Sequence, residues 1–78
     1  MSDVLLREIL GMTLKAHRSA NNMTLRELSA KIYLSLSYLS EVERGIKEPS
    51  SEMLELICKG LNLSIFQLMR DAYRIGLS

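Results

Sequence analysis

The chain has 78 residues, of which 47% are apolar, and this length allows one small domain with a single core. Ten basic and nine acidic residues give a net charge of +1, so bulk charge does not select a nucleic acid or any other partner. A domain of this size buries only about 60–65% of its unfolded surface. We therefore expect its stability to be marginal or shared with a second copy.

The chain has one cysteine and one histidine, which limits the disulfides and metal sites that it could form. The lone Cys58 excludes an internal disulfide, and together with the lone His17 it offers too few ligands for a zinc module, so no metal and no cofactor are expected. We interpret His17 as a packed, hydrogen-bonded core residue with no acid spaced to help it, and Cys58 as an inert core residue. No apolar run approaches the roughly 20 residues of a membrane span, which favours a cytoplasmic protein.

Apolar residues recur at spacings of three and four, which predicts an all-α, five-helix bundle without strands. The first helix is expected over residues 4–20, and it ends at Asn21 and Asn22 because asparagine tolerates the left-handed conformation. Its apolar residues form two neighbouring rows. These rows are Leu6, Leu10 and Leu14, and Leu5, Ile9, Met12 and Ala16.

Two short helices follow, each with its own N-cap. Thr24 and Glu27 fit a capping box, which starts a helix that runs to about Ile32. After a short break, Ser35 caps a helix over residues 36–44, whose inward stripe is Leu39 and Val42 and which Gly45 ends.

The last two helices are also predicted from N-cap residues at their starts. Pro49 excludes helix just before it, and Ser50 caps a fourth helix that ends at Asn62. Ser64 and Gln67 form a second capping-box pattern, which starts a fifth helix running to about Ile75, before Gly76. No linker separates the elements, so we expect one domain over residues 1–78.

Two short, capped helices joined by a tight turn inside a five-helix bundle are typical of a DNA-binding helix-turn-helix. The residues 24–45, followed by Pro49 and Ser50, resemble the Cro/C1-type (XRE-like) helix-turn-helix family over about residues 6–69. Residues 35–57 are most similar to the ClgR-type regulators of actinobacteria, which activate protease and stress genes. The resemblance implies a bacterial, lambda repressor-like DNA-binding domain that regulates transcription.

The resemblance places helix 36–44 in the major groove, with its N-terminal end nearest the base edges. Leu36 stands where the family often has Gln, so we expect it to contact a thymine methyl group. Glu41 is expected to accept a hydrogen bond from a cytosine amine; the alternative is that it is solvated and pairs with a neighbouring Lys or Arg. The candidate base-contacting residues are Ser35, Leu36, Ser37, Ser40 and Glu41.

Other residues are candidates for contacts to the DNA backbone, which position a domain without selecting sequence. They are Thr24, Arg26, Tyr38, Arg44 and Lys47. Two residues depart from the family pattern. Leu25 replaces the usual Gln, so a side-chain phosphate contact is missing, and Tyr33 stands where the turn often has Gly, which predicts either a strained turn or a less left-handed path.

The resemblance also implies a structural ion pair between Arg18 and Glu43, linking the first helix to helix 36–44. Apolar residues at the end of the chain exceed what a small bundle can bury, so we expect residues 65–78 to form a homodimer interface; the alternative is that they fold back as extra core. The candidate interface residues are Ile65, Leu68, Met69, Ala72, Tyr73 and Ile75.

The predicted partner is double-stranded DNA with an inverted-repeat site, read by two chains. The chain has no nucleophile with a base, no carboxylate pair in a cleft and no glycine-rich phosphate loop, so an enzyme is not expected. An antitoxin or protein-interaction module, binding a partner protein through the apolar C-terminal helix, is the alternative. No small-molecule effector domain fits in this length, so control is expected through abundance, RNA polymerase or a protease.

Overall fold

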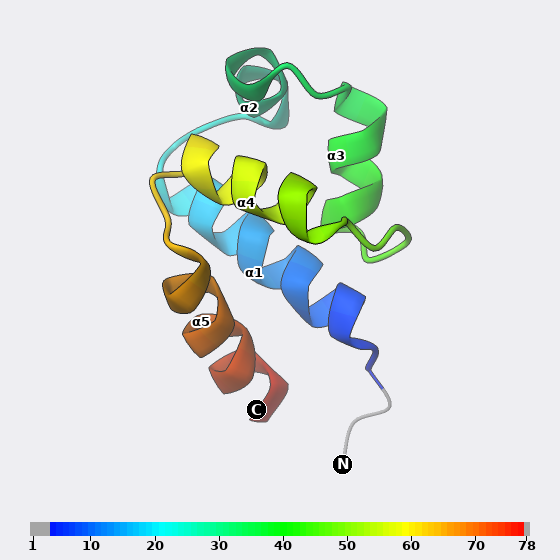
Figure 1. Ribbon diagram of the computed structural model, residues 1–78, viewed down its shortest axis with the longest axis vertical. Helices are drawn as coiled ribbons and strands as arrows, with labels where there is room; N and C mark the ends of the chain where they lie inside the picture. The colour runs from blue at the N-terminus through cyan, green and yellow to red at the C-terminus, as the bar shows by residue number, and fades with distance from the viewer. Residues whose placement is uncertain (1–3, 78) are drawn as a thin grey trace.

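The computed structural model describes residues 4–77, and this part of the chain forms five helices and no strand (Figure 1). Residues 1–3 and 78, which the single-domain prediction includes, lie outside the described residues. The predicted all-α, five-helix fold is confirmed. The helices are α1 (Leu6–Ala20), α2 (Leu25–Ile32), α3 (Leu36–Glu43), α4 (Ser51–Gly60) and α5 (Ile65–Leu77).

The four predicted N-caps are present. The hydroxyls of Thr24, Ser35 and Ser50 accept the backbone N–H three residues later at 3.0, 3.1 and 3.2 Å. Ser64 accepts from Gln67 in the same way, and the Gln67 side chain accepts the Ser64 N–H at 2.9 Å. Each cap satisfies an amide that the helix leaves unpaired, which explains why these starts were predictable from short sequence patterns.

The helix ends are set by residues with positive φ. Asn22 and Asn62 have φ of 54°, and Gly45 has φ of 74°. Tyr33, at the turn between α2 and α3, takes the strained of its two predicted alternatives: its φ is 58°, and its side chain is 93% exposed. A bulky residue in this left-handed region costs about 1 kcal/mol of conformational free energy. The turn keeps this conformation because the flanking helices hold its two ends.

The core draws on all five helices, and α1 packs against α3 and α5 (Figure 1). Leu10 and Leu14 are buried as predicted, but Leu6 is 63% exposed because the first turn of α1 extends beyond the core. No residue of the second predicted row of α1 is buried: Leu5, Met12 and Ala16 are exposed, and Ile9 is half-buried. In its place the small Gly11 and Thr13 are buried, and at Gly11 α1 approaches the backbone of α3 closely.

The fifth helix extends through Gly76 to Leu77, two residues beyond the predicted end. A Cβ on Gly76 would lie 3.3 Å from the Cδ1 atom of Ile9, so the glycine allows close packing of α5 on α1. Among residues 4–77, no helix has the length and apolar character that crossing a membrane requires.

Candidate nucleic-acid interface

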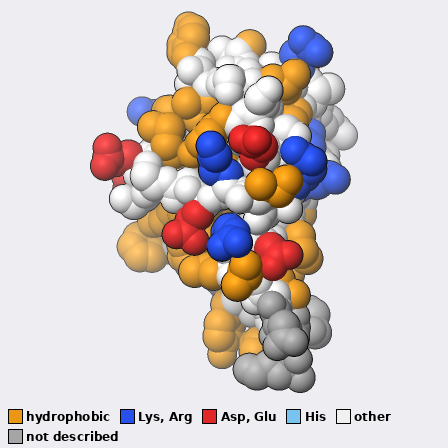
Figure 2. Space-filling model, turned by 90° about the vertical axis from the view of Figure 1, so that its right-hand side faces the viewer, with side chains coloured by type: hydrophobic (Ala, Val, Ile, Leu, Met, Phe, Trp, Pro, Cys, Tyr) orange, Lys and Arg blue, Asp and Glu red, His pale blue; other side chains and the backbone are white. Residues whose placement is uncertain are grey.

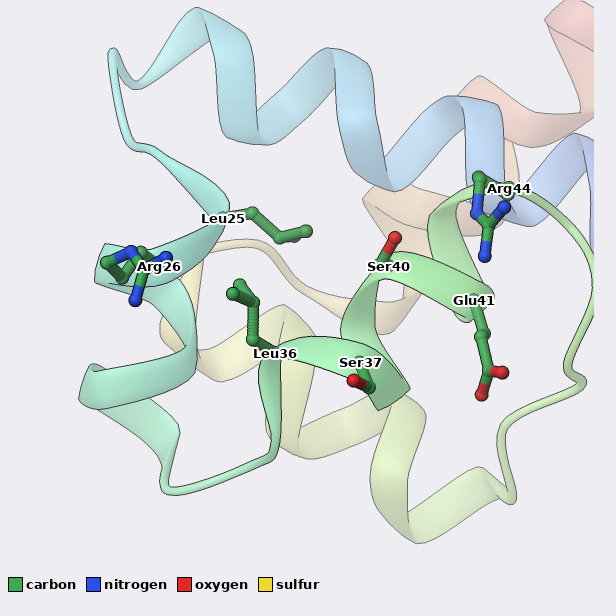
Figure 3. A pocket seen from close by; sticks show the side chains of 7 residues that line it. All are labelled: Leu25, Arg26, Leu36, Ser37, Ser40, Glu41 and Arg44. Carbon is green, nitrogen blue, oxygen red and sulfur yellow. The ribbon is translucent and has the colours of Figure 1, made fainter.

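A groove of about 540 Å³ runs between the beginning of α2 and the outward face of α3 (Figure 3). It contains four of the five candidate base-contacting residues and two of the five candidate backbone-contacting residues. The opposite face of α3 carries Leu39 and Val42, each 1% exposed, and this burial fixes which side of the short helix faces outward. The residues lining the groove are Leu25, Arg26, Leu36, Ser37, Ser40, Glu41 and Arg44.

Ser35 and Thr24 lie at the starts of α3 and α2, and their side chains are engaged as N-caps. The Thr24 N–H also donates to the Glu27 carboxylate at 2.8 Å, completing the capping box. Hydrogen bonds from the Thr24 N–H and then from its side chain hold the pKa of Glu27 below its ordinary value. An acid therefore lies at the start of α2, where the helix dipole stabilises it.

Glu41, which lines the groove, forms a small cluster with Tyr38 and Lys47. The Lys47 Nζ lies 3.9 Å from the Glu41 carboxylate and 5.8 Å from the centre of the Tyr38 ring. Tyr38 itself is half-buried against the core. Because the Glu41 and Lys47 side chains are 39% and 51% exposed, this contact is weak, and it corresponds to the alternative in which Glu41 pairs with a neighbouring cation.

Arg18 of α1 and Glu43 at the end of α3 form a two-pronged ion pair. Arg18 Nε donates to Glu43 Oε2 at 2.6 Å, and Nη2 donates to Oε1 at 3.0 Å. Arg18 Nη1 also donates to the carbonyl of Met23 at 2.7 Å. The side chains are only 13% and 9% exposed, and the hydrogen bonds to Glu43 raise the pKa of Arg18. The pair therefore ties the C-terminal end of α3 to α1.

His17 has a partner that its place in the sequence does not reveal. Its Nε2 lies 2.7 Å from the Oδ2 atom of Asp71 on α5, and both side chains are about a quarter exposed. The expectation of a hydrogen-bonded histidine is correct, but His17 is half-buried and lies outside the core cluster, and the expectation that no acid would be placed to help it is wrong. The two residues are 54 positions apart, so no local pattern could have revealed the contact.

The surface around α3 carries charges of both signs (Figure 2). On this face Lys and Arg side chains alternate with Asp and Glu side chains, and neither sign gathers into one patch. This distribution agrees with the net charge of +1. Long-range attraction to a polyanion is therefore weak, and recognition has to depend on contacts at short range.

The predicted interface residues on α5 are divided between two faces. Leu68 and Ala72 are 0% and 5% exposed in the chain's own core, so their assignment to an exposed interface was wrong. Met69 and Tyr73 are exposed, and so are Phe66 and Leu77, at 82% and 69%. We call Phe66, Met69, Tyr73 and Leu77 the outer α5 face. Ile65 and Ile75 are half-buried between the two faces.

A second groove, of about 390 Å³, adjoins the outer α5 face and continues it onto α1, where Leu6 and Ile9 line it. Within the described part of the chain, no three His, Cys, Asp or Glu side chains gather in a way that could hold a metal ion. Cys58 is buried, and its burial raises the pKa of its thiol.

The sequence and the fold are similar to those of known proteins. The family model described as helix-turn-helix matches residues 14–68. The transcriptional regulator ClgR of Mycobacterium tuberculosis (strain CDC 1551 / Oshkosh) is 48% identical over 68 residues, which are 87% of this chain and 61% of that protein. The chain thus spans about three fifths of the length of this relative.

Two solved structures share the fold closely. The crystal structure of the clp gene regulator ClgR from Corynebacterium glutamicum superposes with a TM-score of 0.90 at 42% identity, over 97% of this chain and 82% of that one. The restriction-modification controller protein C.Esp1396I, crystallised as a tetramer in complex with its natural 35 base-pair operator, gives a TM-score of 0.90 at 28% identity, over 97% of this chain and all of that one.

Proposed function

Since the chain belongs to the Cro/C1-type (XRE-like) helix-turn-helix family, we propose that it binds double-stranded DNA sequence-specifically as a dimer and regulates transcription. The observation that carries the proposal is the groove between α2 and α3, where the outward side chains of a short, capped helix are small, polar or able to contact base edges. A relative of the same fold, C.Esp1396I, is bound to its operator in a crystal structure. We propose no catalytic activity for the chain.

In this proposal α3 enters the major groove. Ser37, Ser40 and Glu41 line the groove with exposed or half-exposed side chains, and Ser35 lies at the N-terminal end of the helix. Hydroxyl groups can donate to or accept from base edges, and a carboxylate accepts from the amine of cytosine. Glu41 would exchange its weak contact with Lys47 for this hydrogen bond.

Backbone contacts in the proposal come from the rim of the same surface. Arg26 and Arg44 flank the groove, and Lys47 lies beside Tyr38 in the segment that follows α3. Thr24 contributes the beginning of α2, although its side chain is already engaged in the capping box. These contacts hold the register of the protein on the duplex.

Dimerisation is proposed through the outer α5 face and the adjoining groove on α1, with residues 65–78 as the dimerisation element. Exposed apolar residues follow one another at spacings of three and four on α5, which makes one continuous face. Two copies would then present their α3 helices to half-sites about 34 Å apart. We also propose that the whole protein contacts RNA polymerase or a protease.

The experiment begins with the selection of binding sites for the full chain from randomised duplexes, followed by titrations of the selected site at several salt concentrations. We expect an inverted repeat and an affinity that falls with salt but stays well above that for random DNA. Binding to all duplexes alike, or to none, would contradict the proposal and would favour a protein-interaction module.

Glu41→Gln tests the base contact within the selected site. Glutamine cannot provide the carboxylate that prefers cytosine, so we expect the preference for cytosine at one position of each half-site to relax, by about 1–3 kcal/mol. A full base-substitution profile measures it. A profile identical to that of the unchanged chain would show that Glu41 belongs to the solvated surface and pairs only with Lys47.

A further inference from the structure

Two leucines stand out in the groove between α2 and α3. Leu25 is the first residue of α2, and Leu36 is the first residue of α3. Figure 3 shows their side chains extending into the same space from the two helices. The other five residues that line the groove carry hydroxyl, carboxylate or guanidinium groups, so the two leucines form its only apolar part.

The core does not account for this apolar surface. Leu25 packs against the core on one side, whereas Leu36 is half-buried without belonging to the core cluster or to the residues packed on it. Both residues are only half-buried, and both line the groove. Apolar area that faces water at a binding surface gains free energy when a ligand covers it with another apolar group.

The chemistry of the major groove limits which chemical group can cover the apolar surface of Leu25 and Leu36. Base edges there carry hydrogen-bond donors and acceptors on every base pair, and the one apolar group among them is the 5-methyl group of thymine. A donor or acceptor placed against Leu25 and Leu36 would lose its hydrogen bonds to water without replacement, which is unfavourable. The pair therefore discriminates in favour of a methyl group and against the other base edges.

We propose that Leu25 and Leu36 act as one apolar clamp that reads the 5-methyl group of a thymine in each half-site. The inference rests on the proposed DNA binding and extends the single contact expected for Leu36, because it makes Leu25, on the other helix, a specificity-determining residue. Leu36 covers one side of the methyl group and Leu25 covers the other. Removing either leucine opens the clamp, so water reaches the methyl group and the group no longer strengthens binding.

The test uses the full chain and its selected site. Each thymine is replaced in turn by deoxyuridine, which lacks only the methyl group, and the Kd of every duplex is measured. We expect one thymine in each half-site at which the replacement weakens binding about fourfold, the scale for burying one methyl group, and about 15-fold when both half-sites are changed.

The variants Leu25→Ala and Leu36→Ala are then measured on the thymine and deoxyuridine duplexes. We expect each variant to bind the two duplexes with nearly equal affinity. The ratio of the two Kd values is internal to each variant, so a loss of folded protein lowers both affinities equally and does not mimic the result. Leu56→Ala, which changes another partly buried leucine outside the groove, is the matched control and should keep the fourfold ratio.

A second readout adds the methyl group to a different base. At the sensitive position, 5-methylcytosine should bind the unchanged chain more tightly than cytosine, and the two alanine variants should not distinguish these bases. A site without any thymine sensitive to deoxyuridine, or a sensitivity that survives in either variant, would overturn the clamp while leaving specific DNA binding intact. Absence of any sequence-specific complex would overturn the proposed function itself and the clamp with it.

Discussion

Arg18 on α1 holds Glu43 at the end of α3 with two hydrogen bonds of 2.6 and 3.0 Å, at a place where both side chains are nearly buried. The pair joins the first helix of the bundle to the helix proposed to read DNA. It adjoins the groove, because Arg18 and Glu43 line a smaller pocket together with Leu25, Ser40 and Arg44, which also line the groove. The two charged groups are bonded to each other, so the effect of the pair on DNA binding should come through the stability and orientation of α3.

Replacing one partner of this ion pair tests that role. Arg18→Met leaves the Glu43 carboxylate buried without a countercharge, so we expect a loss of roughly 3 kcal/mol in the free energy of unfolding, measured by chemical denaturation. The double variant Arg18→Met, Glu43→Leu should recover most of this loss, because no buried charge is left over. Full stability of Arg18→Met together with loss of DNA binding would instead identify Arg18 as a DNA contact.

Gly11 tests the close approach of α1 and α3. A Cβ on this residue would lie against the backbone carbonyl of Val42 and 2.6 Å from that of Glu43, and backbone atoms cannot move aside as a side chain can. We expect Gly11→Ala to lower the free energy of unfolding by about 1–3 kcal/mol. Thermal or denaturant unfolding measures it.

Gly76→Ala is the control for this substitution, because it makes the same change in another helix. Its Cβ would meet only the end of the flexible Ile9 side chain at 3.3 Å. Alanine favours a helix over glycine by up to about 1 kcal/mol, so Gly76→Ala should be neutral or stabilising. Equal effects of the two substitutions would show that the contact between α1 and α3 is looser than described.

The contact between His17 and Asp71 predicts a pH-dependent contribution to stability. The hydrogen bond from His17, with a smaller contribution from Arg70, holds the pKa of Asp71 below its ordinary value. A carboxyl group whose pKa is lower in the folded than in the unfolded state stabilises the fold above its unfolded pKa. This contribution is lost as the pH falls through the folded pKa.

Asp71→Asn should therefore lower the midpoint of thermal unfolding at neutral pH, and the difference from the unchanged chain should shrink at about pH 3 and below. Glu55→Gln, which neutralises an exposed acid on α4, is the control and should have little effect at either pH. A difference for Asp71→Asn that is the same at neutral and acid pH would show that the charge of Asp71 does not contribute to holding α5 on α1.

The outer α5 face predicts the effect of a charge on dimer formation. Tyr73→Asp places a carboxylate in the middle of an exposed apolar face, and desolvating it in an interface is costly, so we expect the dimer to dissociate with little change in helix content. Sedimentation measures the mass, and binding to the inverted repeat should weaken in parallel. Ile46→Asp, at an exposed apolar residue of the segment between α3 and α4, should leave the mass unchanged.

Several features of this protein depend on neighbours along the chain, and these were predictable. A cap at Thr24, Ser35, Ser50 or Ser64 needs only a side chain three residues from an unpaired amide, so a short pattern determines it. The inward stripe of α3 follows from helical spacing. The pairing of Arg18 with Glu43 came from resemblance to a family, since spacing alone gives no reason to join them.

Tertiary structure decided the rest, because it depends on which helix covers which face. The apolar residues of α5 satisfy helical spacing on two sides, and only packing on α1 buries Leu68 and Ala72 while leaving Phe66 and Tyr73 exposed. Sequence by itself determined where four of the five helices begin and which residues α3 turns outward, whereas α1 begins at Leu6, two residues after its predicted start. The contact of His17 with Asp71 and the placement of Leu25 and Leu36 in one groove required the fold, since each brings together side chains from different helices.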